Sequence, residues 1–327
     1  MPARGTATDD ILLVCSGGGH LRQLAGFVDR MSIPIERQFW VTFDNQLSRS
    51  ILSGRRVLHM PFIGPRDLRH FSEALWHSPG VFRERRFAEA ISTGSSPAVA
   101  FLPQAAVRGI PSYYIESAAR ADGPSLTGKL LARIRPIRTF TQYPSWADGR
   151  WRFRGSIFDE FEPFGRPQAA RTPRTAVVTV GTQEGYPFER MLLAVKPLVA
   201  DFDEVLWQTG DADVSRLGID GVASLPHDDL AHAIEHADVV ISHAGVGSAL
   251  TALRAGKHPI LVPREAAHGE HVDDHQVQIA RELERRGLAT LRAVDRLAYI
   301  DLETAAGRSV GTTTPPPFEL HDPAGVH

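Results

Sequence analysis

Two glycine-rich segments are the first places where this sequence could hold a ligand. The first reads Ser16-Gly17-Gly18-Gly19-His20 and follows a short apolar run. Consecutive glycines let a backbone turn sharply and approach another molecule closely, and the amino end of a following helix favours negative charge. The segment matches neither the G-x-G-x-x-G dinucleotide fingerprint nor the Gly-Lys-Ser/Thr of a P-loop. His20 could serve as a general base near neutral pH, although from this segment alone we favour a histidine that only caps or packs the helix.

The second glycine-rich segment, Ser242–Ser248, runs from a β-branched stretch into a glycine turn and then a helical pattern. Backbone N–H groups of residues 246–249 could point at a diphosphate, whose charge the helix dipole would support. The Ser248 hydroxyl could add another donor. Many α/β proteins contain a strand, a glycine turn and a helix in this order, so the pattern fits an anion without identifying it.

A third polar segment, Glu265–Gln276, follows an apolar run and is dense in histidine and carboxylate side chains. It could be a solvated loop, but such density at the carboxyl end of a strand makes a ligand contact the better interpretation. In a sugar site, Asp274 and Gln276 would hydrogen bond to hydroxyl groups. Helix capping by Asp273 or Asp274 ranks second.

The same segment is also a candidate metal site, which we rank last. His271 and His275 have the i, i+4 spacing that lets two imidazoles share one ion. The H-E-x-x-H pattern is absent because Val272 stands in place of the glutamate, and spacing alone identifies no third ligand. We therefore expect no metal and no other cofactor.

Length and composition indicate two globular domains. At 327 residues the chain exceeds the usual size of a single core, and 43% hydrophobic with 23% charged residues is ordinary for a globular protein. The net charge of -2 offers no general attraction to nucleic acid, which we exclude as a partner. The single cysteine, Cys15, fits a reducing compartment. Residues 1–10 lack the apolar core of a signal peptide, and no apolar run approaches the ~20 residues that span a bilayer.

Short apolar runs alternate with amphipathic stretches along the chain, which predicts βαβ units and parallel sheets. The expected strands are Ile11–Cys15, Phe39–Phe43, Val57–Met60, Ser112–Ile115, Ala176–Val180, Glu204–Gln208, Val239–Ser242 and Pro259–Val262. The expected helices are Leu21–Met31, Asp67–Arg86, Pro97–Arg108, Phe188–Val199, Gly247–Ala255 and Gln276–Arg286. The predicted fold class is therefore α/β, with two doubly wound, Rossmann-like domains facing a cleft.

The domain boundary is predicted from a proline- and arginine-rich stretch, Glu162–Arg174, which has no periodicity and is the best linker candidate. We expect an N-terminal domain over residues 1–165 and a C-terminal domain over residues 175–305. Residues 306–327 contain three consecutive prolines and are expected to form a flexible tail.

The C-terminal half resembles a family of glycosyltransferases. Val178–Thr182, Ser242–Ser248 and Asp274–Gln276 are similar to the catalytic subunit of the two-subunit transferase that adds the second GlcNAc to lipid-linked oligosaccharide. That subunit is similar to the donor-binding half of the bacterial transferase that makes lipid II, in glycosyltransferase family 28.

The N-terminal half resembles the partner subunit of the same two-subunit transferase. The matching segments are Ser16–His20, Ser92–Gly94, Tyr114–Ser117 and Pro124–Lys129. The sequence therefore looks like a fusion of both subunits, and the likeness extends from about residue 11 to residue 287.

The resemblance implies the GT-B fold, inversion at the anomeric carbon and no catalytic metal. On the donor side it implies contacts to a UDP-sugar from Gly181, Thr182, His243, Gly245, Val246, Gly247, Ser248, Thr251, Asp274, His275 and Gln276. On the acceptor side it implies Gly17, Gly18, Gly19, Glu116 and Ser125, with His20 as the base. One position departs from the family, because Thr251 stands where a glutamate usually bonds the ribose hydroxyls, and a threonine cannot make that bidentate contact.

The implied function is transfer of a sugar from a UDP-sugar to a polyprenyl-diphosphate-linked saccharide in cell-surface polysaccharide or glycolipid synthesis. The stretch Arg66–Phe87 mixes arginines with aromatic and aliphatic residues, which predicts either an interfacial helix or an ordinary surface helix. A lipid-linked acceptor favours the first interpretation. We expect a cytoplasmic protein that is peripheral on the inner face of the cell membrane, and a homo-oligomer stays open.

Two other functions fit the same fold. A UDP-sugar 2-epimerase would need several carboxylates, for which Glu116, Glu184 and Asp274 are available. A membrane scaffold for a separate transferase would need no donor-binding half, and the presence of that half argues against it.

Overall fold

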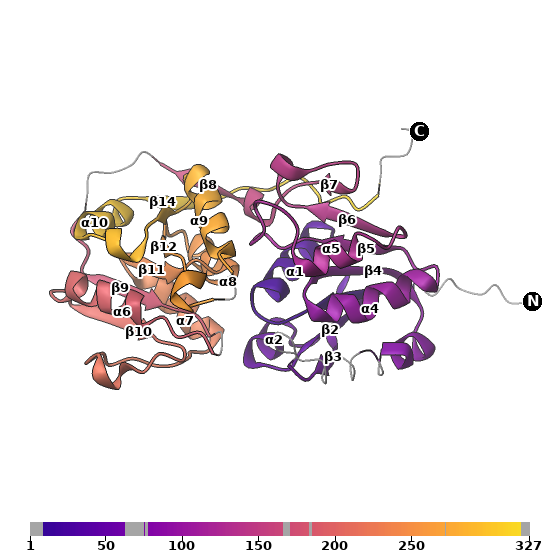
Figure 1. The fold of residues 1–327 in the computed structure, drawn as a ribbon, viewed down its shortest axis with the longest axis horizontal. Helices are drawn as coiled ribbons and strands as arrows, with labels where there is room; N and C mark the ends of the chain where they lie inside the picture. Colours follow the sequence, from indigo (N-terminus) through magenta and orange to yellow (C-terminus); the bar gives the residue numbers. More distant parts are fainter. Residues whose placement is uncertain are drawn as a thin grey trace, which may run out of the picture. The chain divides into compact units, whose positions relative to one another are not determined.

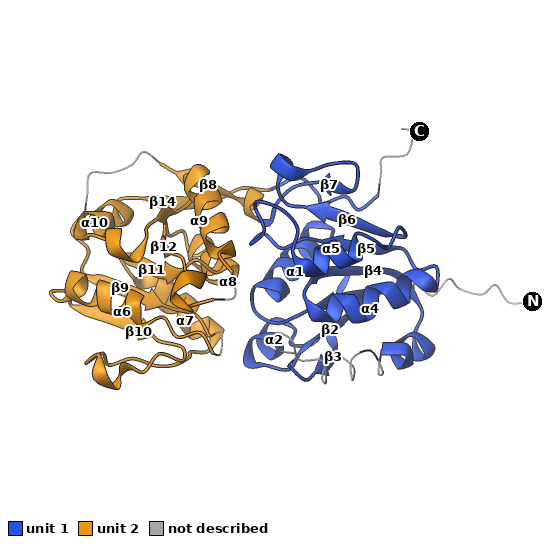
Figure 2. Ribbon diagram, viewed as in Figure 1, with its two compact units in different colours: residues 1–157, 315–327 blue, residues 158–314 orange. Residues whose placement is uncertain are grey.

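The computed structural model describes residues 9–62, 75, 78–165, 171–182, 185–271 and 273–321. The chain divides into two compact units (Figure 2). Unit 1 contains residues 1–157 and 315–327, and unit 2 contains residues 158–314. Each unit is built on a parallel sheet whose strands are joined through helices (Figure 1), so the predicted α/β class is confirmed.

Unit 1 contains a seven-stranded parallel sheet in the order β3-β2-β1-β4-β5-β6-β7. Its strands are β1 (Asp10–Cys15), β2 (Gln38–Phe43), β3 (Arg56–Met60), β4 (Phe87–Gly94), β5 (Ser112–Ile115), β6 (Ile137–Thr141) and β7 (Trp151–Phe153). Its helices are α1 (Gly19–Arg30), α2 (Gln46–Ile51), α4 (Ser96–Val107) and α5 (Leu126–Leu131). Strands β1 and β2 are buried at nearly every position, as expected for parallel strands that are covered on both faces.

Unit 2 contains a five-stranded parallel sheet in the order β10-β9-β11-β12-β13 and a two-stranded antiparallel ribbon. The strands of the sheet are β9 (Thr175–Thr179), β10 (Glu204–Gln208), β11 (Val239–His243), β12 (Ile260–Val262) and β13 (Thr290–Leu291), and the ribbon pairs β8 (Phe161–Phe164) with β14 (Ser309–Thr312). The helices are α6 (Glu189–Val195), α7 (His227–His236), α8 (Val246–Arg254), α9 (His275–Arg285) and α10 (Tyr299–Ala306).

Strand β4 is the main element that the sequence pattern missed. The pattern extended an amphipathic stretch through Phe87, but Phe87 begins β4 and is only 6% exposed. Within the predicted helix 67–86, residues 78–84 are helical, and residues 67–74, 76 and 77 lie outside the described residues. Only Phe87, Ile91 and Thr93 in β4 are aromatic or β-branched, and they are separated by alanine, glutamate and serine, so the enrichment that normally indicates a strand is weak.

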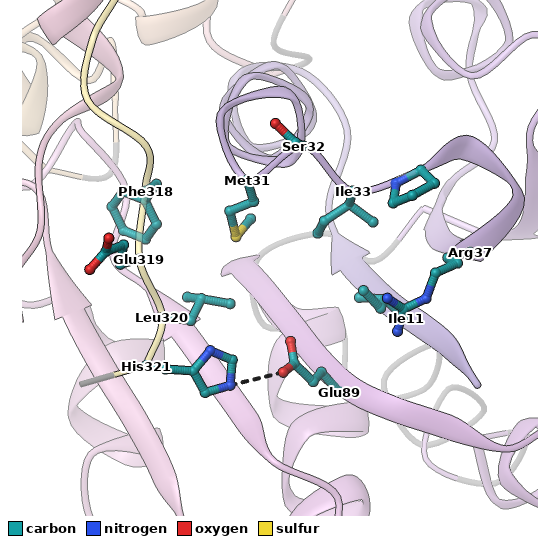
Figure 3. Close-up of a pocket in the computed structure, with 11 residues that line it drawn as sticks. Ile11, Met31, Ser32, Ile33, Arg37, Glu89, Phe318, Glu319, Leu320 and His321 are labelled. Atoms are coloured by element: carbon teal, nitrogen blue, oxygen red, sulfur yellow. Dashed lines mark ion pairs between the residues drawn. The ribbon is translucent and has the colours of Figure 1, made fainter. Parts of the chain in front are cut away.

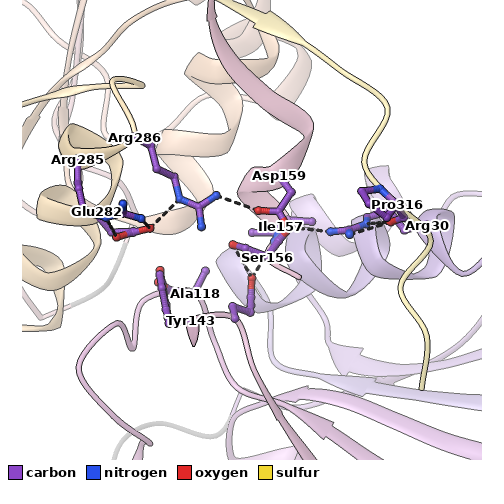
Figure 4. Close-up of polar contacts among 11 residues, drawn as sticks. Arg30, Ala118, Tyr143, Ser156, Ile157, Asp159, Glu282, Arg285, Arg286 and Pro316 are labelled. Carbon is purple, nitrogen blue, oxygen red and sulfur yellow. Dashed lines mark hydrogen bonds and ion pairs between the residues drawn. The ribbon is translucent and has the colours of Figure 1, made fainter. Parts of the chain in front are cut away.

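The carboxyl-terminal segment differs from the flexible tail that the sequence predicts. The chain passes between units at residues 157–158 and again at 314–315, and β14 pairs with β8. Phe318 is 2% exposed, and its ring lies 4.5 Å from that of Phe27 and 5.9 Å from that of Phe140. Arg30 donates to the carbonyls of Ser156 (2.6 Å) and Pro316 (2.9 Å) (Figure 4). The buried Phe318 ring and the hydrogen bonds of the Arg30 guanidinium therefore hold residues 315–321 on unit 1, although this segment contains prolines.

A groove of about 470 Å³ lies beside this segment in unit 1 (Figure 3). Phe318 and Leu320 line one wall, and the His321 Nε2 atom lies 3.0 Å from the Glu89 carboxylate. Ile11, near the start of β1, also lines the groove. The groove is therefore at the amino edge of the sheet, away from the glycine segment that follows β1.

We predict that Phe318→Ala will destabilise the protein by about 3–5 kcal/mol, because it empties an aromatic site in the core. The free energy of unfolding in urea measures this loss. Phe164→Ala is the matched control, since Phe164 is 66% exposed. Equal losses for the two variants would show that residues 315–321 are not anchored in this way.

Candidate functional site

Both glycine-rich segments lie where strand order reverses in their sheets. In unit 1 the chain builds outward from β1 through β2 and β3, then from β4 in the other direction, and Gly17–His20 follow β1. In unit 2 the order reverses between β9 and β11, and Gly181 and Gly245 follow those two strands. Ligands of doubly wound sheets bind at the carboxyl ends of strands at such switch points. Topology therefore selects the same two places that residue types indicated.

His20 is held by a reciprocal contact with Thr93, across the switch point of unit 1. The His20 Nδ1 atom lies 2.6 Å from the Thr93 carbonyl oxygen, and the Thr93 hydroxyl donates to the His20 carbonyl at 2.9 Å. Because a carbonyl oxygen can only accept, Nδ1 carries the proton in this contact. In the neutral ring, Nε2 is then the nitrogen that can take a proton, which is the arrangement a general base needs.

Close contacts favour glycine at Gly17 and Gly94 beside His20, and a positive φ favours it at Gly18. A Cβ on Gly94 would stand 3.1 Å from His20 Cε1, and the φ of Gly94 is +102°. Gly18 has a φ of 64° and precedes the first residue of α1. A Cβ on Gly17 would stand 2.5 Å from the Asn45 side-chain amide, whereas Gly19 lies within the first turn of α1. These glycines thus shape the loop around its own neighbours, in addition to leaving its backbone open.

Glu116 and Ser125, expected on the acceptor side, bond to each other inside unit 1. Glu116 is 1% exposed, and its carboxylate accepts four hydrogen bonds, from Tyr114 OH, the Ser117 N–H, and the N–H and hydroxyl of Ser125. Burial raises the pKa of Glu116, and these bonds oppose that shift. A Cβ on Gly128 would collide with this carboxylate. These hydrogen bonds hold residues 116–128 in place beside the His20 loop, so they are structural contacts.

Gln23 is a site-forming residue that the sequence pattern missed. It is 1% exposed on α1, and its side-chain oxygen accepts from the Ala118 N–H (2.7 Å) and the Gln142 amide (2.9 Å). Its amide nitrogen donates to the Gly19 carbonyl (3.0 Å) and the Ser117 hydroxyl (3.2 Å). Gln23 therefore ties the glycine loop to the segments after β5 and β6. The sequence could have indicated this role, because Gln23 lies on the apolar face of the predicted helix Leu21–Met31, where a polar side chain needs buried partners.

In unit 2 the imidazole of His243 fills the space between two glycines. A Cβ on Gly181 would stand 2.5 Å from His243 Cε1, and a Cβ on Gly245 would overlap the same ring. Burial, followed by the nearby Arg264 cation, lowers the pKa of His243 to about 3. The ring is therefore neutral at physiological pH. Gly181 is predicted as a ligand contact, and the structure shows that it also makes room for this histidine, while Thr182 beside it is exposed.

Helix α8 presents its amino end at this switch point. Gly245 is the N-cap residue without a side-chain cap, and Val246 and Gly247 follow, with Ser248 half-buried in the first turn. The first N–H groups of a helix have no partner within the helix, so this end suits an anion. Thr251 is 4% exposed and its hydroxyl donates to the Gly247 carbonyl at 2.9 Å. That hydroxyl is engaged inside α8, where the resemblance implied a ribose contact.

Arg264, directly after β12, is a second residue that sequence patterns did not select. It is 1% exposed, and Nη2 donates to the Val180 carbonyl at 2.8 Å. Among the described residues, its buried Nε and Nη1 atoms find no hydrogen-bond partner, and the same holds for His243 Nδ1. Burial lowers the pKa of Arg264 to about 10, which leaves it charged at neutral pH. The carboxylates of Glu270 and Asp211 lie close enough to oppose this shift, and the buried guanidinium places positive charge at this edge of the sheet.

Side chains at the start of α9 are hydrogen-bonded to the backbone of the segment that follows β12. The side-chain amide oxygen of Gln276 accepts from the Arg264 N–H at 3.0 Å, and the Asp274 carboxylate accepts from the Ala266 N–H at 2.8 Å. Asp274 is the N-cap residue of α9 but makes no side-chain cap; Asp273 instead accepts from the His275 N–H at 3.4 Å. The expected sugar contacts Asp274 and Gln276 thus have internal partners, and His275 pairs with Asp273 by a short contact.

Comparison with known proteins identifies the C-terminal unit. Residues 175–298 match the glycosyltransferase family 28 C-terminal domain. A UDP-N-acetylglucosamine transferase subunit of Yarrowia lipolytica is 41% identical over 93 residues, which cover 28% of this chain and 45% of that protein. The UDP-N-acetylglucosamine–N-acetylmuramyl-(pentapeptide) pyrophosphoryl-undecaprenol N-acetylglucosamine transferase of Solidesulfovibrio magneticus is 28% identical over 261 residues, which cover 70% of this chain and 66% of that protein. The chain therefore spans about half to two-thirds of the length of these relatives.

Solved structures share the fold over most of the chain. MurG of Acinetobacter baumannii has a TM-score of 0.55 at 16% identity, over 90% of this chain and 88% of that one. The glycosyltransferase SnogD of Streptomyces nogalater has a TM-score of 0.56 at 16% identity, over 91% and 90%. The match over residues 175–298 confirms the predicted resemblance of the C-terminal half to family 28 transferases, and these structures confirm the predicted GT-B fold.

We predict that Gly245→Ala will lower the free energy of unfolding by about 1–3 kcal/mol, because the added methyl group displaces the His243 ring. Urea unfolding of single and double variants measures the coupling. In a His243→Ala background the loss should disappear, since the clash is then absent. Gly149→Ala is the control, because a Cβ there meets open space. A loss that persists without the imidazole would contradict this packing.

Proposed function

We propose that this chain, whose C-terminal unit contains a glycosyltransferase family 28 domain, transfers a sugar from a UDP-sugar to a polyprenyl-diphosphate-linked saccharide. The reaction belongs to cell-surface polysaccharide or glycolipid synthesis and inverts the anomeric carbon. Unit 2 binds the donor, and unit 1 supplies the base. The observation that carries the proposal is the His20–Thr93 contact at the switch point of unit 1, on a chain whose other unit matches a transferase family.

The proposed step is a single displacement. His20 Nε2 takes the proton from an acceptor hydroxyl while that oxygen attacks the anomeric carbon and the bond to UDP breaks. The Thr93 carbonyl holds the proton on Nδ1 and stabilises the imidazolium that forms. Because the leaving group departs opposite the attacking oxygen, the anomeric configuration inverts.

The leaving diphosphate gains negative charge in this step and needs compensation. The amino end of α8 offers N–H groups at residues 246–248, and the buried Arg264 cation adds positive potential at the same edge. His243, with its lowered pKa, stays neutral and adds no charge of its own. These groups support transfer without a metal ion or other cofactor.

The structure gives less support to a UDP-sugar 2-epimerase. That reaction would use several carboxylates, but Glu116 is buried with four hydrogen bonds and Asp274 holds the Ala266 N–H. Glu184 lies outside the described residues. A scaffold without activity is disfavoured because residues 175–298 match the C-terminal domain of a transferase family.

We predict that His20→Ala will reduce acceptor-dependent release of UDP by about 10²- to 10⁴-fold, the usual worth of a general base. The assay offers a panel of UDP-sugars with polyprenyl-diphosphate saccharides and measures UDP, and calorimetry follows donor binding, which should stay unchanged. His59→Ala, on the edge strand β3, controls for loss of a histidine. Near-normal turnover of His20→Ala would reject the base, and UDP release without any acceptor would reject the transfer.

The proposed acceptor is a lipid, so the protein would act on the inner face of the cell membrane. None of the helices in the described part of the chain has the length and apolar character that crossing a bilayer demands. Within the predicted interfacial stretch, Phe87 is core and Phe82 packs against it. Leu126 and Leu130 on α5 are 75% and 41% exposed.

Lys129 is exposed on α5 three residues after Leu126, so these two side chains share a face of the helix, and Arg133 is exposed in the turn that follows α5. An apolar and basic face suits an anionic bilayer surface. We therefore propose a membrane contact at Leu126–Arg133, on α5 and the turn after it, while residues 66–74, 76 and 77 of the predicted interfacial stretch lie outside the described residues.

We predict that Leu126→Ser/Leu130→Ser will lower the partition onto anionic liposomes by roughly tenfold or more, since burying each leucine contributes about 1.5 kcal/mol or more. Flotation measures the bound fraction. Val107→Ser is the matched control, because Val107 is 80% exposed at the far end of α4. Equal flotation of all three proteins would exclude the α5 face.

A further inference from the structure

Helix α7 carries three metal-ligating side chains on its last turn. His232, Glu235 and His236 stand at positions i, i+3 and i+4, so they share one face of the helix. Each offers one ligand atom, and these atoms all lie within 4.8 Å of one another. The two imidazole centroids are 4.2 Å apart. One divalent ion at ~2.1 Å from each atom fits such a group with little movement.

The tautomer of His236 is already set for ligation. Its Nδ1 atom lies 2.8 Å from the His232 carbonyl oxygen, which can only accept, so Nδ1 carries the proton and the Nε2 lone pair is the ligand. Metal-binding histidines commonly donate their second ring N–H to a carbonyl or carboxylate in this way, which orients the ring. The contact lies within α7, so folding of the helix produces it.

Neighbouring residues hold the last turn of α7 in place, and the charges around it have opposing effects on a bound cation. Ile234 is 1% exposed and anchors α7 in a small apolar cluster with Leu230 and Ala233. The carboxyl end of a helix carries partial negative charge, which attracts cations. Lys257 opposes a dication, since its ammonium donates to the Ala237 carbonyl at 2.7 Å and lies close enough to Glu235 to be affected by its charge. The Glu235 carboxylate offsets that repulsion.

A second group in the described residues has a similar composition but a less open arrangement. His271, Asp273 and His275 also place ligand atoms within 4.8 Å. There, His275 and Asp273 are already joined by a short contact, and the His271 side chain is only 5% exposed. An ion would have to break that pair and enter a covered site. All three residues on α7 are exposed, so an ion can reach them directly.

We propose that His232, Glu235 and His236 bind a divalent transition metal ion of the Zn²⁺ type. Two imidazoles and one carboxylate are a usual Zn²⁺ ligand set, and the fourth position is open to water. The group precedes β11, so it lies at the amino end of that strand, whereas His243 and the proposed donor site lie at its carboxyl end. The ion is therefore separate from the proposed transfer reaction, which needs none.

The test is calorimetric titration of the tag-free, full-length protein with Zn²⁺ at neutral pH, supported by the visible absorption spectrum of Co²⁺ as a substitute. We expect one equivalent of ion, with a tetrahedral Co²⁺ spectrum. His232→Ala and His236→Ala should each weaken binding by about tenfold or more, and Glu235→Gln should weaken it while the protein remains folded by circular dichroism.

His275→Ala is the matched control, because it removes a ligand from the other group and should leave the measured equivalent in place. Loss of binding in His275→Ala with retention in His236→Ala would overturn the assignment. So would the absence of a saturable equivalent in the unaltered protein. Neither result depends on transferase activity, so failure here and failure of the proposed function are distinguishable.

Discussion

An imidazole ring occupies the space next to a glycine at both switch points of this protein, and the candidate sites depend on that packing. In unit 1 the His20 ring lies against Gly94, where a Cβ would stand 3.1 Å away. In unit 2 the His243 ring lies between Gly181 and Gly245. Each ring lies between the carboxyl ends of two neighbouring strands, β1 and β4 in unit 1 and β9 and β11 in unit 2. The absence of a side chain on these glycines therefore decides where the loops can sit.

The two rings differ in their electrical environment, and this difference separates their roles. His20 donates from Nδ1 to the Thr93 carbonyl, an arrangement that leaves Nε2 as the basic nitrogen. His243 lies beside the buried Arg264 cation, and its pKa falls to about 3. A neutral ring, a buried guanidinium and the amino end of α8 together suit an anion. In the proposed reaction, unit 1 would therefore take the proton of the acceptor and unit 2 would stabilise the charge of the leaving diphosphate.

Buried polar side chains hold the loops of both candidate sites in place through hydrogen bonds. Glu116 and Gln23 accept or donate hydrogen bonds to the loops after β1, β5 and β6, and Gln276 does so for the loop after β12. Such groups are costly to bury unless every bond is made, so they fix a single arrangement of the loops. Several residues that looked like ligand contacts are therefore also the framework that positions the backbone.

The sequence by itself determined the parallel α/β architecture, because uninterrupted apolar runs such as residues 11–15 and 239–242 are typical of strands covered on both faces. It also located the glycine segments and the family resemblance, since these depend on residues that are adjacent in the chain. It could not reveal β4, whose few aromatic and β-branched residues give only a weak strand pattern.

Only the tertiary structure decided which partners meet. Thr93 lies 73 residues from His20, and Phe318 packs on Phe27 from the far end of the chain. Periodicity records which faces of an element are buried, whereas a contact between distant residues depends on sheet order and register. Those are set when the whole core packs, and no local pattern encodes them.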